Sequence, residues 1–197
     1  MPEPVLIPIS RERSITLLTG DITQQDADAI VNAANEQLAP GGGVCGAIHR
    51  AGGSQIWKEC QEIVAQRGAL ATGQAVATTA GKMKSGHVIH TVGPVWHGGR
   101  SGEPDKLASC YRESIRIADD LKLKSIAFPS ISTGIFGYPV ELAAPVALQA
   151  VAATLESAKH VTEVRFVLFD SATFAAYTDA ARNFHNVKLE TRNVKLS

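Results

Sequence analysis

The sequence has few cysteines and no surplus of charge of either sign. Its 197 residues include three cysteines, and 19 basic side chains balance 19 acidic ones. Cys45, Cys60 and Cys110 form no C-x-x-C motif and cannot all pair, which indicates reduced thiols in a cytoplasmic protein. The neutral balance argues against a broad nucleic-acid-binding surface, although it leaves room for a local basic groove.

Long apolar runs are also missing. No stretch is apolar for long enough to span a bilayer, and residues 1–10 lack the charged and apolar regions of a signal peptide. Hydrophobic residues make up 45% of the chain and charged residues 19%, which is typical of a globular protein. No His, Cys or Asp cluster has the spacing of metal ligands, so we expect neither a metal nor another cofactor.

Strand-like and helix-like segments alternate along the chain, which predicts an α/β fold with a mostly parallel sheet covered on both faces. We expect one domain over residues 1–197, with its core at about 15–184. Apolar and β-branched runs predict strands at residues 14–18, 28–31, 74–79, 87–92, 125–128 and 164–169. Helical spacing and punctuating residues predict helices at residues 54–66, 105–121, 139–158 and 171–184, the last capped by Ser171. Residues 5–7 are expected to form an edge strand or an ordered arm, and residues 186–197 a short extension or a further edge strand.

The segment from Gly41 to Gly53 contains three consecutive glycines before a predicted helix start at residues 47–51. A glycine-rich loop that leads into a helix N-terminus directs free N–H groups at one point, which suits an anion. A flexible surface loop is the alternative. The segment has no lysine, which excludes a Walker A motif. Gly41-x-Gly43-x-x-Gly46 matches the dinucleotide fingerprint, but residues 32–40 separate it from its strand. We therefore predict a phosphate site of another kind.

Polar and glycine-rich segments follow the predicted strands at their carboxyl ends. Ligands of open α/β sheets bind at that edge, so these segments predict a binding cleft. They are residues 20–22, 32–35, 93–94, 130–137 and Asp170.

Five motifs, in order, resemble those of the macrodomain family over about residues 15–184. They are Gly20-Asp21-Ile22-Thr23, Asn32-Ala33-Ala34-Asn35, the segment Gly41 to Gly53, Ile89-His90-Thr91-Val92-Gly93-Pro94 and the segment Pro129 to Pro139. The likeness is greatest to the branch that removes ADP-ribose or acetyl groups from ADP-ribose derivatives. The resemblance implies a three-layer α/β/α domain that hydrolyses O-acetyl-ADP-ribose and mono-ADP-ribosylated acidic side chains. Its implied partners are ADP-ribose, the O-acyl and protein-linked derivatives of ADP-ribose, and mono-ADP-ribosylated proteins.

The resemblance also assigns ligand contacts. Asp21 would bind the adenine amino group, beside a backbone contact from Ile22, and Phe169 would pack near the adenine. Asn35 would bind the distal ribose, which Phe136 would cover. The diphosphate would lie between two sets of residues: Gly42, Gly43 and Val44 on one side, and Ser132, Thr133, Gly134, Ile135 and Phe136 on the other. Each contact has a structural alternative: a turn cap for Asp21, an Asx-turn or helix cap for Asn35, plain core for Phe169 and an irregular turn for residues 130–137.

Cys45 departs from the pattern of the hydrolase branch, in which an aspartate usually follows the Gly-Gly-Gly-Val run. A carboxylate can orient water, whereas a neutral thiol is a poor acceptor. We consider Asn35 and Cys45 the candidate catalytic residues. Cys45 could pair with His49 one helical turn away as an activated nucleophile, or it could be a small buried residue. A non-catalytic ADP-ribose-binding module is the alternative function. We interpret His90 as a hydrogen-bonded structural residue, and Trp57 and Trp96 as core or rim.

Overall fold

The computed structural model describes residues 2–194, with side chains as far as residue 184. In this range the strands are β1 (Val5–Pro8), β2 (Ser14–Thr19), β3 (Ala29–Ala34), β4 (Ala75–Thr79), β5 (His87–Val92), β6 (Ser125–Phe128) and β7 (Glu163–Leu168). The helices are α1 (Gly43–Gly52), α2 (Ser54–Arg67), α3 (Glu103–Asp120), α4 (Val140–Ser157) and α5 (Ser171–Val194), with a short 3₁₀ helix η1 (Ile22–Gln24).

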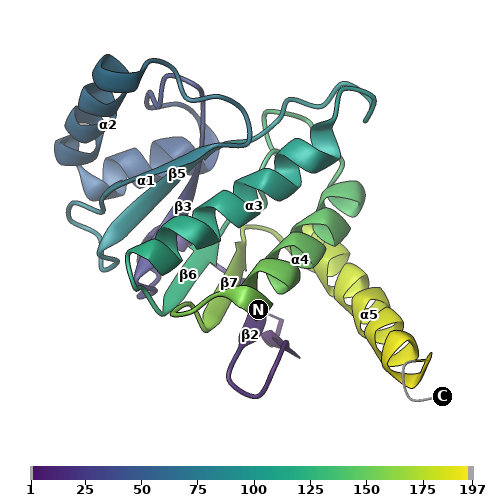
Figure 1. The fold of residues 1–197 in the computed structure, drawn as a ribbon. Helices are drawn as coiled ribbons and strands as arrows, with labels where there is room; N and C mark the ends of the chain where they lie inside the picture. Colours follow the sequence, from purple (N-terminus) through teal and green to yellow (C-terminus); the bar gives the residue numbers. More distant parts are fainter. Residues whose placement is uncertain (1, 195–197) are drawn as a thin grey trace.

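The strands form one sheet in the order β1-β2-β7-β6-β3-β5-β4 (Figure 1). The pairings from β2 to β5 are parallel, whereas the edge strands β1 and β4 run antiparallel to their neighbours. The predicted mostly parallel sheet is therefore confirmed. The segment at residues 5–7 is an edge strand, the first of the two expected alternatives.

Helices cover both faces of the sheet, which confirms the three-layer α/β/α arrangement (Figure 1). On one face Ile30 of β3 packs in a cluster with Ile48 of α1 and Ile56 of α2. On the other face Val31, the next residue of β3, packs in a cluster with residues of α3, α4 and α5. Because both faces are buried, the inner strands need apolar side chains at successive positions, and their sequences have them.

Several boundaries differ from the prediction by a few residues, and three of the differences are informative. The strand β3 continues through Ala34, so Asn32 lies inside the sheet. Asp170, not Ser171, caps α5, because its carboxylate Oδ1 accepts a hydrogen bond of 2.7 Å from Thr173 N. The helix α5 continues past Phe184 to Val194, so the further edge strand predicted from residue 186 is wrong. No glycine or proline ends the helix there, and the last residues of the predicted extension, 195–197, lie outside the described part.

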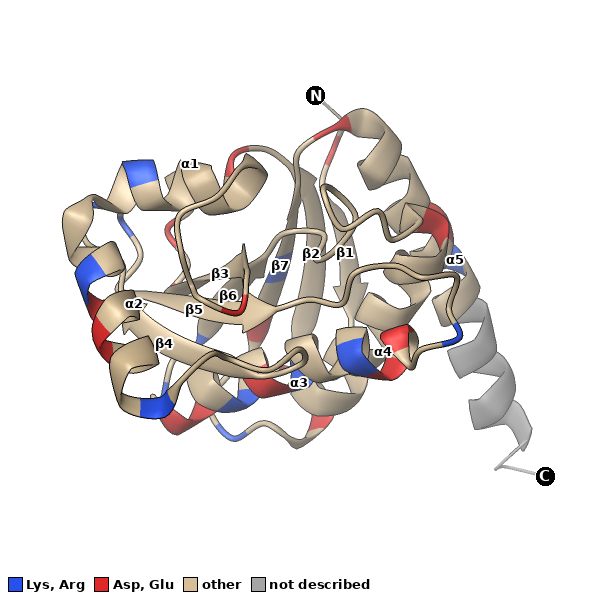
Figure 2. Ribbon diagram, turned by 90° about the horizontal axis from the view of Figure 1, so that it is seen from above, with Lys and Arg blue, Asp and Glu red and all other residues tan. Residues whose placement is uncertain are grey.

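Charged residues of both signs lie along α2 and α3 (Figure 2). None of the helices within residues 2–194 has the length and apolar character that crossing a membrane requires.

Candidate functional site

Five parallel strands bring the predicted polar segments to one edge of the sheet. Asp21 follows β2, Phe169 follows β7, Ser130 lies just after β6, Asn35 follows β3 and Gly93 follows β5. The strand order β2-β7-β6-β3-β5 therefore places these residues in a row. Three strand spacings separate β2 from β3, roughly 14 Å, which provides a long edge for an extended ligand.

Two loops meet above the middle of this edge. We call residues 36–42 the glycine loop and residues 129–139 the serine loop. A Cβ added to Gly42 would lie 3.2 Å from Ile135 Cδ1, so the two loops approach each other closely there. Ile135 is nevertheless 81% exposed. The segments predicted to enclose a diphosphate are thus brought together.

The helix α1 begins at Gly43, inside the glycine run, earlier than predicted. Gly42 caps it without a side-chain hydrogen bond. Gly43 has a φ of 55°, and a Cβ added there would meet no atom within 4 Å. The first turn of a helix has N–H groups without intrahelical acceptors, so an open helix start of this kind suits an anion. Val44, next in the chain, is half-buried against the core.

The end of the row at β2 and β7 presents one carboxylate and one exposed ring. Asp21 Oδ1 accepts hydrogen bonds from Thr23 N at 2.8 Å and Thr23 Oγ1 at 2.7 Å, so Asp21 is the turn cap that was one of its alternatives. Its other oxygen, Oδ2, is left for a ligand. Phe169 is 88% exposed, which shows that the alternative of plain core is wrong. Ile22 buries its side chain, so only its backbone could contact a ligand.

The serine loop is held by hydroxyl groups. Thr133 Oγ1 donates to Ser130 Oγ at 2.9 Å, and Ser130 Oγ lies 3.1 Å from the hydroxyl of Tyr177 in α5. Ile131 N donates to the hydroxyl of Tyr111 in α3 at 3.3 Å. Sequence reasoning missed both tyrosines, because nothing in their local pattern distinguishes them from core residues.

Other positions of the serine loop are shaped by close backbone approach. Ser132 has a φ of 67°, and a side chain at Gly93 would overlap with its buried hydroxyl. Gly134 is exposed, and a Cβ there would meet nothing within 4 Å. Phe136 is half-buried, and its carbonyl accepts a hydrogen bond of 2.9 Å from Trp96 N. Trp96 packs against the core as expected of a core or rim residue, and so does Trp57 on the other face.

Asn35 forms the Asx-turn that was its structural alternative. Its Oδ1 accepts hydrogen bonds from Gln37 N and Ala39 N, both at 3.1 Å, and its Nδ2 donates to Ala39 O at 2.8 Å. The amide therefore closes the glycine loop on itself. One hydrogen of Nδ2 remains for a ligand.

Cys45 does not pair with His49. Its sulfur lies 3.6 Å from both Asn32 Nδ2 and Ala39 O. Neither ring nitrogen of His49 has a hydrogen-bond partner among the described residues. The proposed nucleophilic pair is therefore wrong, because the helix directs the two side chains to different neighbours. Cys45 is only 5% exposed, which agrees with the alternative of a small buried residue.

The fold also gathers a buried cluster that the sequence spacing concealed. Ligand atoms of His49, Cys60 and His90 lie within 4.8 Å of one another. Both ring nitrogens of His90 already have partners, Asn32 Nδ2 at 3.0 Å and Thr78 Oγ1 at 2.9 Å, as expected of a structural histidine. Burial raises the pKa of Cys60 to about 12. A metal would have to displace Thr78 and a thiol proton, so the cluster is a weak candidate for one.

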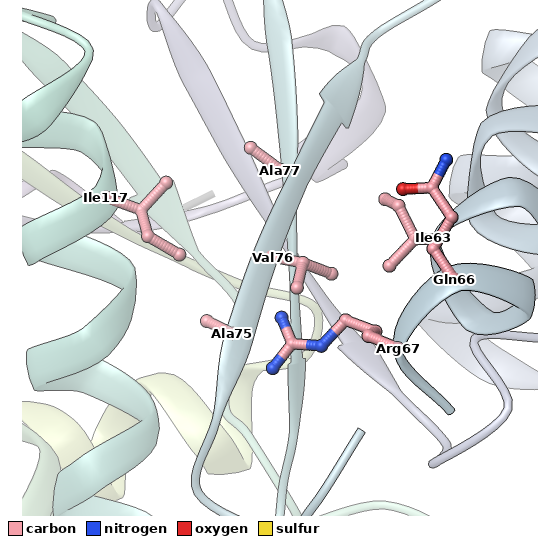
Figure 3. A pocket seen from close by; sticks show the side chains of 7 residues that line it. All are labelled: Ile63, Gln66, Arg67, Ala75, Val76, Ala77 and Ile117. Atoms are coloured by element: carbon pink, nitrogen blue, oxygen red, sulfur yellow. The ribbon is translucent and has the colours of Figure 1, made fainter. Parts of the chain in front are cut away.

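A surface hollow of about 380 Å³ lies at the edge strand β4, which passes between α2 and Ile117 of α3 (Figure 3). Its lining is largely aliphatic, with the polar heads of Gln66 and Arg67 at one side. None of the predicted site residues lines it, and we assign it no role.

Comparison with known proteins identifies close relatives. The family model described as Macro domain matches residues 31–147. A macro domain-containing protein of Caldanaerobacter subterraneus is 50% identical over 169 residues, which cover 86% of this chain and 96% of the relative. One of Streptomyces coelicolor is 55% identical over 167 residues, covering 83% and 95%.

Solved structures of macrodomains are also similar to this chain. A mutant of the Oceanobacillus iheyensis macrodomain with ADPR has a TM-score of 0.89 at 36% identity, covering 93% of this chain and all (100%) of that one. The macrodomain of Trypanosoma brucei in complex with ADP-ribose has a TM-score of 0.76 at 35% identity, covering 87% and 72%.

Proposed function

The chain belongs to the macrodomain family, and from that premise we propose that it binds ADP-ribose and hydrolyses ADP-ribose derivatives. The proposed substrates are proteins with mono-ADP-ribosylated acidic side chains and O-acetyl-ADP-ribose. A non-catalytic ADP-ribose-binding module is the second candidate. Cys45, which stands where the hydrolase branch usually has a carboxylate and whose sulfur lies against Ala39 O, favours that candidate.

The observation that carries the proposal is the meeting of the glycine loop and the serine loop at Gly42 and Ile135, since neither loop contains a lysine or an arginine. Backbone N–H groups and a helix start can bind a diphosphate without lysines, which agrees with the neutral composition. On one side of this point in the strand order lie Asp21 and Phe169, which suit an adenine. Asn35, which suits the distal ribose, ends β3, the strand from which the glycine loop leads. This order along the edge supports an extended ligand built like ADP-ribose.

For hydrolysis, the chain must position water without a carboxylate at residue 45. The free Nδ2 hydrogen of Asn35 can hold the distal ribose, and the phosphate of the substrate itself can orient the water. Cys45 then contributes little beyond filling its place. The chain could therefore hydrolyse its substrate without the usual general base. Its turnover would then be slower than that of an enzyme that has one.

Binding is tested by calorimetry with free ADP-ribose. We expect micromolar affinity, roughly −8 kcal/mol, and much weaker binding of AMP. Asp21→Ala should weaken binding by about 1–3 kcal/mol, because the adenine amine loses its acceptor. The fold should survive, because the lost turn cap is exposed. The absence of heat with wild type would end the proposal, and unchanged affinity in the variant would place the adenine elsewhere.

Turnover is tested by the release of ADP-ribose from a protein mono-ADP-ribosylated on carboxylates. Wild type should release it, and Asn35→Ala should lose most of that activity, because both the loop closure and the ribose contact disappear. Binding without release in wild type would identify the non-catalytic module instead.

A further inference from the structure

Glu103 is a buried carboxylate that holds a loop by its backbone amides. It is the first residue of α3 and is 1% exposed. Its Oε1 accepts hydrogen bonds from His97 N at 2.9 Å and Gly99 N at 3.2 Å, and its Oε2 accepts one from Ser101 N at 2.6 Å. Among the described residues it has no ion-pair partner. The carboxylate therefore gathers residues 97–101 around itself.

The sequence of this loop needs such an anchor. Gly98 and Gly99 have positive φ angles of 86° and 79°, and glycine loses more backbone entropy on folding than any other residue. Burial opposes ionisation of Glu103, but hydrogen bonds from the backbone outweigh it and hold the pKa of the carboxyl below its ordinary value. At neutral pH the group is therefore a carboxylate, which has only acceptors to offer to the three amides.

The preceding amide of the same loop holds the serine loop. Trp96 N donates to Phe136 O at 2.9 Å, and the ring centroids of Trp96 and Tyr138 are 4.3 Å apart. The amide of His97, bound by Glu103, belongs to the next peptide group. Each peptide group is a rigid plane, and these two planes share the Cα of Trp96. By fixing one plane, Glu103 restrains the direction of the Trp96 N–H.

The part of the serine loop that Trp96 holds is the turn that meets the glycine loop. A hydrogen bond of 3.0 Å from Gly137 N to Gly134 O closes this turn, and Phe136 lies inside it. Ile135, also inside the turn, is the residue that approaches Gly42. The hydrogen bond to the Phe136 carbonyl therefore fixes the turn opposite the glycine loop, where the proposed function places the diphosphate.

We propose that Glu103 is a positioning residue of the ADP-ribose site, which holds residues 96–101 so that Trp96 N fixes the turn of the serine loop beside the diphosphate. This inference rests on the proposed binding of ADP-ribose. Because Glu103 is buried under its own loop, its effect on the ligand passes through the backbone of residues 96–101 and 134–137.

Calorimetry with ADP-ribose on the Glu103→Gln variant tests the inference. Glutamine has nearly the same size, but its amide nitrogen is a donor and would face an N–H group where a carboxylate oxygen accepted. The loop should shift, and binding should weaken by about fivefold, which is within the range for residues that act on a site through packed neighbours. ADP should show the same loss, because the turn faces the diphosphate.

Asp119→Asn is the matched control. Asp119, near the end of α3, accepts hydrogen bonds of 2.6 to 3.0 Å from the backbone N–H groups of Lys159, His160 and Val161. These three residues precede β7, at the end of the strand away from the site. The control should lose a similar free energy of unfolding and leave ADP-ribose affinity unchanged. If Glu103→Gln is destabilised but binds ADP-ribose as wild type does, the carboxylate only ties its own loop and the inference is wrong.

Gly99→Ala disturbs the same route without removing the carboxylate. A Cβ at Gly99 would lie 2.9 Å from Cη2 of the Trp96 ring, so Trp96 would have to shift. This variant should also weaken ADP-ribose binding. Its loss and that of Glu103→Gln should add to less than their sum in the double variant, because both act through Trp96.

Additive losses, or unchanged affinity in Gly99→Ala, would refute the route through Trp96. If Glu103→Gln does not fold, Gly99→Ala decides the question alone. Wild type that binds no ADP-ribose would overturn the proposed function and this inference together, whereas normal binding by wild type and by both variants would overturn this inference only.

Discussion

The glycine loop and the serine loop face each other across the same edge but rest on different supports. Behind the serine loop, Ile131 N donates to the hydroxyl of Tyr111, and the hydroxyl of Tyr177 lies 3.4 Å from that of Tyr111 and 3.1 Å from Ser130 Oγ. Behind the glycine loop, the Cys45 thiol makes only long contacts, such as the 3.6 Å between Cys45 Sγ and Ala39 O. Both ring nitrogens of His49 lack partners in the described structure.

This difference in support predicts that the two loops respond differently to substitution. A loop held by several hydroxyl contacts keeps its backbone in one place for a ligand, whereas a loop backed by a weakly bonded thiol can be altered at that thiol with little loss. Binding should therefore depend on the shape of the glycine loop and on the donors of the serine loop, and only weakly on the thiol behind Gly42. The following predictions test that division.

The largest effect is expected at Gly43, the first residue of α1, directly after the glycine loop. Gly43→Glu should abolish ADP-ribose binding beyond detection by calorimetry, because its side chain would enter empty space and bring a negative charge to the diphosphate site. The positive φ of 55° adds backbone strain for any side chain.

Gly68→Glu separates that strain from the loss of the site. Gly68 also has a positive φ, 80°, and open space around it, but it caps the far end of α2. The Gly68→Glu variant should lose a comparable free energy of unfolding but bind ADP-ribose as wild type does. Normal binding by Gly43→Glu would refute the loop assignment.

Acid should destabilise the support of the glycine loop selectively. Burial lowers the pKa of His90 to about 3 and lowers that of His49 as well, so both are neutral in the folded protein. An unfolded histidine titrates near 6.5. Protonation therefore favours the unfolded state as pH falls below about 6.5, and the stability from each neutral histidine is lost progressively down to its folded pKa.

We expect the free energy of unfolding to fall by about 2–3 kcal/mol between pH 6.5 and 4.5 for a fully buried histidine such as His90. Denaturant unfolding at the two pH values measures this. His90→Asn keeps an acceptor near the position of Nδ1 and removes the titrating ring, so it should flatten the pH dependence by that amount. Tyr177→Phe should leave the slope unchanged, and a slope equal in all three proteins would contradict the prediction.

The fold was largely predictable from the sequence. Strands buried on both faces need continuous apolar runs, which can be recognised in the sequence. The predicted bounds of β5 and β6 are therefore confirmed. The β3 boundary was missed because Asn32 is polar, although its amide has a buried partner in His90. The capping of α5 was missed because Asp170 and Ser171 both suit a helix start, and only geometry shows which carries the hydrogen bond.

The site was predictable as a set of loops but not as a set of contacts. The motifs placed Asn35, Gly42 and Ile135 at one edge, since parallel strands end together. Hydrogen bonds between distant side chains leave no local pattern, so Tyr111 and Tyr177, 66 positions apart, could not be linked from the sequence. The Cys45–His49 pair was wrong for a related reason, because helical spacing brings residues near each other without showing what each side chain contacts.

The smallest effect is expected at Cys45. Its variants test whether the thiol behind the glycine loop takes part in the reaction or only fills space. Cys45→Ala should keep turnover within about threefold of wild type, because the thiol contributes only two long contacts of 3.6 Å, each weaker than an ordinary hydrogen bond. Cys45→Asp should raise turnover, by up to about 100-fold, because a carboxylate there would accept from Asn32 Nδ2 and turn away from Ala39 O, providing a general base near the distal ribose. Single-turnover release of ADP-ribose from one modified protein measures all three enzymes, with ADP-ribose affinity as the control for an intact site. A Cys45→Ala variant that binds normally but releases nothing would show that the thiol takes part in the chemistry, and the glycine loop would then rest on more than weak packing.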